Sequence, residues 1–146
     1  MFTEWPENVL GEKTEKFVIS VYNDSDYYDI IKQFYSKHKI RDREVLVNHI
    51  TNKKEINNCH ILFVTPHSIP KLKEILEITN KIPVLTVSDS KGFASLGVLI
   101  NLFIDDNKVR FEINEKAVKS SGLVMSYHLL KFAKIVEFTD DKNTIN

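Results

Sequence analysis

The stretch that decides the fold is residues 82–114, IPVLTVSDSKGFASLGVLINLFIDDNKVRFEIN. Residues 83–87 form a short run of apolar residues with high β propensity, which is typical of a buried strand. Residues 98–104 and 109–114 are two further runs of this kind, and the polar residues 105–108 between them predict a hairpin turn. The stretch therefore predicts one strand followed by a hairpin of two more.

A polar turn, residues 88–93 (SDSKGF), separates that strand from the hairpin. Ser88 and Asp89 come directly after the predicted strand, and Gly92 begins a segment, 92–96, that is predicted to be a short helix or turn. The turn is therefore expected at the carboxyl end of a strand, where α/β domains commonly carry their binding sites.

Before this stretch the chain alternates predicted strands with predicted helices. Strands are predicted at residues 17–22 (FVISVY), 44–50 (EVLVNHI) and 59–65 (CHILFVT). Apolar residues at helical spacing predict a helix over 27–38, and a second helix is expected to open at Ser68. This alternation predicts an α/β layered domain with a mostly parallel central sheet and flanking helices, completed by a C-terminal β-hairpin and a helix.

Two helices carry more detailed predictions. In the helix over 27–38 the side chains expected to face inward are Tyr27, Ile30, Ile31, Phe34 and Tyr35. Ser68 is expected to cap the second helix, with Pro70 in its first turn.

A last helical region is predicted from residue 115, is broken at Gly122 and continues over 123–138, and residues 139–146 are expected to form a loose tail.

Length and composition restrict the class of protein. The chain has 146 residues, which fits a single domain over 1–146. Lys plus Arg and Asp plus Glu each number 20, so the formal net charge is zero and no basic excess points to a nucleic-acid partner. No apolar run approaches the ~20 residues of a membrane span.

Polar residues gather at three predicted strand ends. Since the carboxyl ends of parallel strands meet at one edge of a sheet, these residues could form a polar pocket there. Asp, Asn and Ser also stand at strand ends because they form turns and caps, so both interpretations stay open. The residues concerned are Asn23, Asp24, Asp26, Thr65, Pro66, His67, Ser88, Asp89 and Ser90.

Signals for catalysis are weak. Ser88, Asp89 and His67 are the residue types of a hydrolase triad, but the strained G-x-S-x-G turn that exposes a nucleophile is absent. The histidines show no metal-ligand spacing, and the glycines match no nucleotide-binding motif, so no cofactor is predicted. Cys59 is the only cysteine and is expected to be a small core residue.

Five short motifs in a fixed order resemble the YfiR family. They are WP at 5–6, CHILF at 59–63, VLTVSD at 84–89 running into GFA at 92–94, RFEIN at 110–114, and Ser126 followed by LL at 129–130. The resemblance covers nearly the whole chain, and it implies an α/β domain with a central sheet and no catalytic activity.

The resemblance also implies a function. It predicts an extracytoplasmic regulatory or sensor domain that controls a membrane-bound diguanylate cyclase, or a sensor kinase, by protein–protein contact. The motif positions, taken as ligand- or partner-binding residues, are Ser88, Asp89, Gly92, Phe93, Arg110, Glu112 and Asn114. The alternative is a small-molecule-binding protein that uses a pocket at the carboxyl edge of the sheet; a Ser/His hydrolase is the least favoured reading. A small ligand and a homodimer both stay open.

Location and redox behaviour are inferred by resemblance as well. Family chains carry an export signal and a helix before the Trp-Pro pair, whereas the residues before Trp5 lack the basic start and apolar core of a signal peptide. We therefore expect a periplasmic protein whose N-terminal helix and export segment have been trimmed. Several relatives have paired cysteines; Cys59 has no partner, so redox control through an internal disulfide is not expected.

Overall fold

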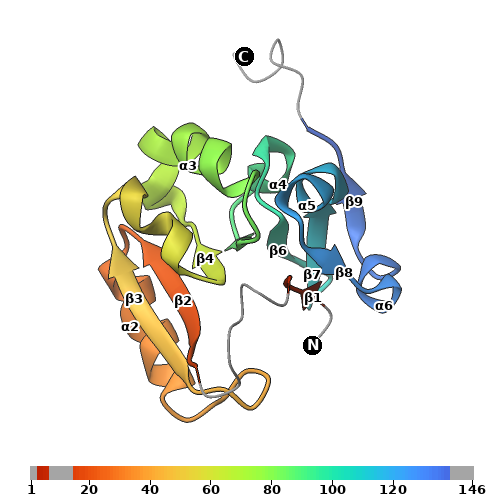
Figure 1. Ribbon diagram of the computed structural model, residues 1–146. Coiled ribbons are helices and arrows are strands. Elements are labelled where there is room, and N and C mark those ends of the chain that lie inside the picture. The colour runs from red at the N-terminus through yellow and green to blue at the C-terminus, as the bar shows by residue number, and fades with distance from the viewer. Residues whose placement is uncertain (1–2, 7–14, 139–146) are drawn as a thin grey trace.

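A seven-stranded sheet forms the centre of the molecule, in the order β3-β2-β4-β5-β6-β7-β9 (Figure 1). The computed structural model describes residues 3–6 and 15–138. Every neighbouring pair is parallel except β6 and β7, so the predicted mostly parallel α/β sheet is confirmed. The strands are β2 (Phe17–Tyr22), β3 (Val45–Ile50), β4 (Ile61–Phe63), β5 (Leu85–Ser88), β6 (Ile100–Asp105), β7 (Lys108–Asn114) and β9 (Lys134–Val136).

Helices cover both faces of this sheet. The apolar cluster on one face includes residues of α2 (Ser25–Tyr35) and α5 (Glu115–Ser121). The cluster on the other face includes residues of three elements that follow strands: the 3₁₀ turn η1 (Lys53–Asn58), α3 (Leu72–Thr79) and α4 (Phe93–Leu96). Two layers of helix around one sheet bury the strands on both sides, which is why β4 reads as a continuous apolar run.

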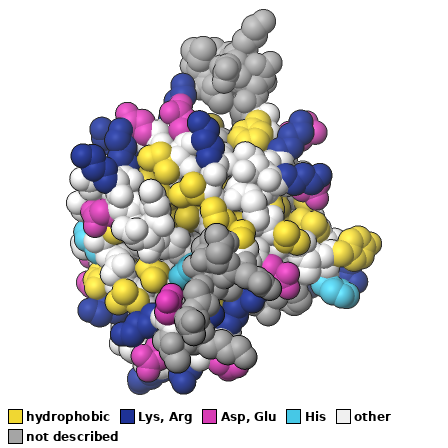
Figure 2. Space-filling view, viewed as in Figure 1, with side chains coloured by type: hydrophobic (Ala, Val, Ile, Leu, Met, Phe, Trp, Pro, Cys, Tyr) yellow, Lys and Arg dark blue, Asp and Glu magenta, His cyan; other side chains and the backbone are white. Residues whose placement is uncertain are grey.

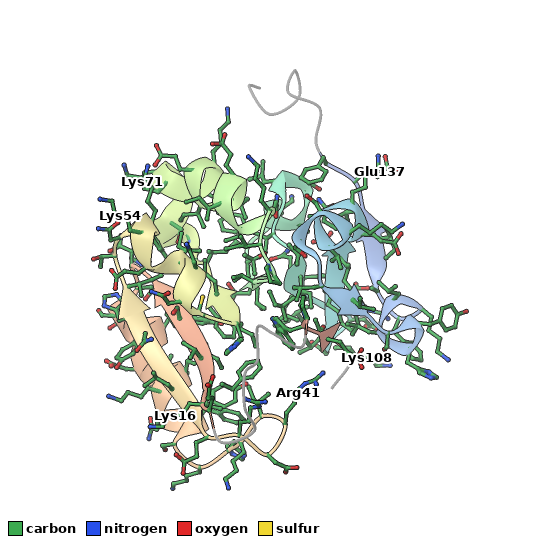
Figure 3. The ribbon with its side chains drawn as sticks, in the orientation of Figure 1. Lys16, Arg41, Lys54, Lys71, Lys108 and Glu137 are labelled. Atoms are coloured by element: carbon green, nitrogen blue, oxygen red, sulfur yellow. The ribbon has the colours of Figure 1, made fainter. Side chains whose placement is uncertain are left out.

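The loops at the carboxyl edge of the sheet lie together, as the parallel order requires. Lys54, in η1 after β3, and Lys71, in η2 (Pro66–Lys71) after β4, lie at the same end of the molecule (Figure 3). Lys16, just before β2, lies at the opposite end (Figure 3). An ion pair of 3.6 Å between Lys53 Nζ and Glu74 Oε2 joins η1 to α3 at the carboxyl edge.

The helix predicted over 27–38 forms, but its inward face was predicted only in part. Tyr28, Ile31 and Tyr35 pack on the sheet, whereas Ile30 is 63% and Phe34 54% exposed. α2 covers the edge of the sheet at β2 and β3, so a narrower stripe suffices to bury its contact face. The Phe34 ring stacks instead on His38 at the surface, with centroids 4.2 Å apart.

Two other helix predictions were wrong in detail. The second helix is preceded by η2, whose cap is Thr65: its hydroxyl accepts from the backbone N–H of His67 at 3.3 Å. Ser68 is buried inside η2 and does not cap. After Gly122, the predicted helix over 123–138 is replaced by β8 (Val124–Met125), α6 (Tyr127–Leu130) and β9, because tertiary pairing of these segments with β1 and β7 overrides their local helical pattern.

The predicted hairpin forms with a two-residue turn. β6 and β7 pair antiparallel from Ile100↔Ile113 to Asp105↔Lys108. Asp106 and Asn107 both have positive φ, 52° and 60°, which is the conformation of a type I′ turn. Asn and Asp adopt this region more readily than most side chains, so the polar sequence fits the turn.

Cys59 lies in the core, as predicted. Its thiol is buried and donates to the backbone oxygen of Ile56 at 3.2 Å. Burial raises the pKa of Cys59 to about 12, against a smaller opposing effect of a hydrogen bond with Ser20. The reactive thiolate is therefore scarce at neutral pH.

No helix within residues 3–6 and 15–138 has the length and hydropathy needed to cross a bilayer. Residues 139–146, expected to form a loose tail, lie outside the described residues.

Candidate functional site

The turn after β5 is held to the hairpin by one buried amide. Ser88 donates its hydroxyl to Asn101 Oδ1 at 2.7 Å, and the backbone N–H of Ser90 donates to the same oxygen at 2.9 Å. Asn101 Nδ2 in turn donates to Glu112 Oε1 at 3.0 Å. Asn101 thereby links β5, the turn, β6 and β7 through its own side chain.

Two ion pairs complete the polar side of the hairpin. Lys134 Nζ, on β9, lies 4.0 Å from Glu112 Oε2. Arg110 Nε lies 3.2 Å from Asp105 Oδ2, and both side chains are more than half exposed, so this pair contributes under ~1 kcal/mol. Of the predicted site residues, Glu112 therefore belongs to the hydrogen-bond network around Asn101, and Arg110 is exposed to solvent.

Three further predicted site residues support the turn. Asn114 is fully buried; its Nδ2 donates to the Ala94 carbonyl at 2.8 Å, and its Oδ1 accepts from Ala117 N at 3.1 Å, capping α5. Phe93 is buried in the second apolar cluster. Gly92 has φ +85°, a conformation that side chains other than glycine rarely adopt, and it precedes α4.

A cavity of about 720 Å³ lies beside this network, between the turn and the hairpin. It combines apolar hairpin side chains with two acidic and two basic groups, which is the mixture found in small-ligand pockets. Its lining residues are Asp89, Lys91, Asn101, Leu102, Phe103, Ile104, Val109, Glu112 and Lys134.

A second polar cluster lies where the strand order reverses. From β2 the chain moves to β3 on one side and then to β4 on the other, so the ends of β2 and β4 flank the crevice where open α/β sheets bind ligands. Asp24 follows β2 and His67 follows β4, and Asp24 Oδ2 lies 3.7 Å from His67 Nε2. Asp24 also accepts from the backbone N–H of Tyr27 at 3.0 Å as the cap of α2.

The ionisation of this cluster follows from its contacts. Partial burial alone would raise the pKa of Asp24, but hydrogen bonds from Tyr27 N and the Thr65 side chain, with His67 nearby, outweigh it and hold the pKa below 3.8. Burial, together with the negative charges of Asp89 and Asp24, raises the pKa of Tyr27 above 10.0. The strand-end carboxylates thus lie within electrostatic reach of one aromatic hydroxyl.

The geometry does not assemble a hydrolase triad. The Ser88 hydroxyl donates to Asn101, His67 faces Asp24, and no hydrogen bond joins Ser88 to His67 within the described ranges. Among the same residues there is no group of three or more His, Cys, Asp or Glu side chains that could hold a metal ion.

Sequence reasoning missed three residues of the site. Asn101 stands alone as an amide in the apolar run VLINLFI, and that contrast was an available signal. Lys134 reaches Glu112 because β9 pairs with β7, but its segment was predicted to be helical. Tyr27 was expected in the core, yet its half-buried ring lies 5.6 Å from that of Phe63 at the strand ends.

The fold and the site together define an open, mostly parallel α/β domain with a polar carboxyl edge. A solved structure with this fold is the ligand-free, open form of a substrate-binding protein with adhesive properties from Clostridium difficile, at TM-score 0.63 and 14% identity. The match covers 86% of this chain and 56% of that one, so the chain spans about half the length of its neighbour. At this identity the likeness extends to the fold alone.

The sequence identifies the family. The YfiR/HmsC-like family model matches residues 1–134, and the chain therefore belongs to the YfiR/HmsC-like family. A comparison with curated proteins finds no match.

The cap of α2 gives a pH-dependent prediction. Replacing Asp24 by Ala should lower the free energy of unfolding by about 1 kcal/mol at pH 7, because the first turn of α2 loses its acceptor. The folded-state pKa of Asp24 lies below 3.8, so its charge contributes stability above that pH, and this contribution is lost as pH falls through the folded-state pKa. Urea unfolding at pH 7 and at pH 3 should show the penalty shrinking, and an equal penalty at both would contradict this role. Asp24→Asn is the matched control, since Asn caps without a charge.

Asn114 gives a second prediction. Asn114→Ala should lower the free energy of unfolding by about 2 kcal/mol, because two buried hydrogen bonds are lost at once. Asn52→Ala is the control: Asn52 caps the exposed η1 turn by accepting from Lys54 N at 2.9 Å, and it should cost well under half as much. Equal effects in denaturant unfolding would show that burial of the Asn114 amide adds nothing.

Proposed function

We propose that the chain is a non-enzymatic, extracytoplasmic regulatory domain that controls a membrane-bound signalling protein of diguanylate cyclase type by direct contact. The observation that carries this proposal is membership of the YfiR/HmsC-like family over residues 1–134. The founding type of the family, by the resemblance stated above, represses a membrane-bound diguanylate cyclase from the periplasm and lowers cyclic-di-GMP output. A sensor kinase is the other kind of partner that the family suggests.

The internal bonding of the site supports a non-catalytic role. Ser88, the one hydroxyl side chain among the predicted site residues, is buried and donates its hydroxyl proton to Asn101. Phe93 and Asn114 are also buried, so they act on a partner only by fixing the turn and the hairpin. Asp89, Gly92 and Arg110 are exposed and are the motif residues that a partner could touch directly.

The end of the hairpin is the surface that we assign to the partner. Ile104 and Val109 pair across the strands and are 76% and 71% exposed. The exposed Arg110–Asp105 ion pair is next to them along the strands but lies on the opposite face of the hairpin, because successive side chains alternate between the two faces. Large apolar side chains exposed together on a strand end are typical of a contact surface, because burying them against a partner supplies affinity.

This surface gives a binding prediction. The double variant Ile104→Ser, Val109→Ser should bind its partner at least ~10-fold more weakly, since two contacts in the centre of the interface are lost. Binding is measured by biolayer interferometry against the extracytoplasmic domains of membrane cyclases and kinases encoded beside the gene. Val124→Ser, a change at a 61% exposed valine on β8, is the matched control.

The regulatory proposal fails if the unaltered domain binds none of these partners and instead turns over a substrate. If the double variant and the control bind equally well, the partner surface lies elsewhere.

A second candidate function is small-ligand binding in the cavity between the turn and the hairpin. The cavity of about 720 Å³, with Asp89, Glu112 and Lys134 on its wall, is the observation that favours it. Because Glu112 and Lys134 face each other there, a ligand with both an acidic and a basic group would match the cavity.

Thermal unfolding in the presence of nucleotides, amino acids and aromatic metabolites tests this candidate. A ligand at about 100 times its Kd should raise the free energy of unfolding by about 2.7 kcal/mol. Lys134→Gln should reduce that shift, and Lys54→Gln, far from the cavity, should not. A flat screen would count against the candidate.

A further inference from the structure

A second cavity, of about 590 Å³, lies between α3, α4 and the end of β9. It shares only Lys91 with the cavity beside the hairpin. Leu72, Leu76 and Phe93 are buried and form its floor, while half-exposed apolar side chains form its walls. Those wall residues are Ile69, Leu96 and Phe138.

The rim of this second cavity is basic. Lys73, Lys81 and Lys91 line it against a single acidic residue, Glu77. None of the three lysines forms an ion pair with a residue in the described ranges. Figure 2 shows hydrophobic and basic side chains next to one another on the surface around α3. An apolar floor with a surplus of cations on the rim is complementary to an amphipathic anion.

The wall also holds a buried acceptor without a donor. Asn80 lines the cavity, and its Oδ1 is buried with no hydrogen-bond partner in the part of the chain that the structure describes. Gly97 makes room for this amide: a Cβ at that position would lie 2.8 Å from Asn80 Nδ2 and 3.2 Å from a Phe138 ring carbon. Less than 1 Å² of this oxygen is exposed, so a donor on a ligand can reach it only after the Asn80 side chain turns toward the cavity, and the cost of leaving the carbonyl unpaired favours that turn.

We propose that this second cavity binds a free aliphatic carboxylic acid that carries a hydroxyl group on its chain, the hydroxy fatty acid class. The chain lies on Leu72, Leu76 and Phe93. The carboxylate is held by Lys73 and Lys81, and the hydroxyl donates to Asn80 Oδ1 once that side chain has turned toward the cavity. An aliphatic chain is favoured because four of the six apolar lining residues are Leu or Ile. This binding does not rest on the regulatory function proposed above.

Isothermal titration calorimetry with three ligands of equal chain length tests the proposal. 3-Hydroxydecanoate, below its micelle concentration, should bind the unaltered domain. Decanoate should bind about 5-fold more weakly, because it lacks the hydroxyl, and 1-decanol should bind at least ~10-fold more weakly, because it lacks the charge. Asn80→Leu should abolish the preference for 3-hydroxydecanoate over decanoate.

Variants of the rim and wall locate the site. Lys73→Gln with Lys81→Gln should weaken 3-hydroxydecanoate binding at least ~10-fold, and Lys54→Gln with Lys116→Gln should leave it unchanged. Leu96→Glu should abolish binding, and Val124→Glu, an exposed apolar site elsewhere, should not. Thermal unfolding of each variant without ligand verifies that it folds.

The proposal is overturned if the unaltered domain does not bind 3-hydroxydecanoate, or if Leu96→Glu binds as well as Val124→Glu. It is also overturned if 1-decanol binds as tightly as the acid, since the cavity would then be an unselective apolar surface. All these measurements use the isolated domain without a partner, so their failure leaves the regulatory function untouched.

Discussion

The hairpin keeps its place against the sheet because of the Asn101 side chain. This buried amide accepts from Ser88 and from the backbone of Ser90 and donates to Glu112, so one residue fixes the end of β5, the turn and both hairpin strands. Both cavities depend on this arrangement, since the turn forms a wall of each. An apolar side chain of similar size would leave the Ser88 hydroxyl, the Ser90 N–H and the Glu112 carboxylate without that partner, and unpaired buried polar groups are costly.

Much of the sheet could be predicted because its strands have unambiguous local signals. A few residues suffice to predict each of the strands β2, β4 and β5, because each is a short apolar run. The same holds for the hairpin turn, because Asp and Asn adopt positive φ more readily than most residues. The burial of individual side chains on α2 could not be predicted from local sequence. Ile30 and Phe34 share helical spacing with Tyr35, but which helical side chains are buried depends on the strands that the helix packs against. β9 could not be predicted for a similar reason: its three residues form a strand only because they pair with β7.

The sequence indicated where the candidate residues lie, but it did not indicate their contacts. Ser88, Gly92, Phe93 and Asn114 all lie at the turn and the hairpin, and their hydrogen bonds, burial and backbone conformation show that they hold these two segments in place. Side-chain pairing between β6 and β7 and between β7 and β9 sets these roles, and register is not encoded in any one segment. The Asp24–His67 contact was foreseeable, because parallel strands bring their carboxyl ends to one edge.

The pairing of β1 (Thr3–Glu4) with β8 has a consequence for the order in which the domain folds. Trp5 packs edge-on against Phe17, with ring centroids 5.2 Å apart, and donates its indole N–H to the His60 carbonyl at 3.1 Å. Thr3 and Glu4 pair with Met125 and Val124, so this contact closes a loop of roughly 120 residues, whereas the contacts of Trp5 with Phe17 and His60 close much shorter ones. Because loop-closure entropy opposes long-range pairing, we expect Trp5 to dock first and the β1–β8 pair to form among the last contacts of the domain.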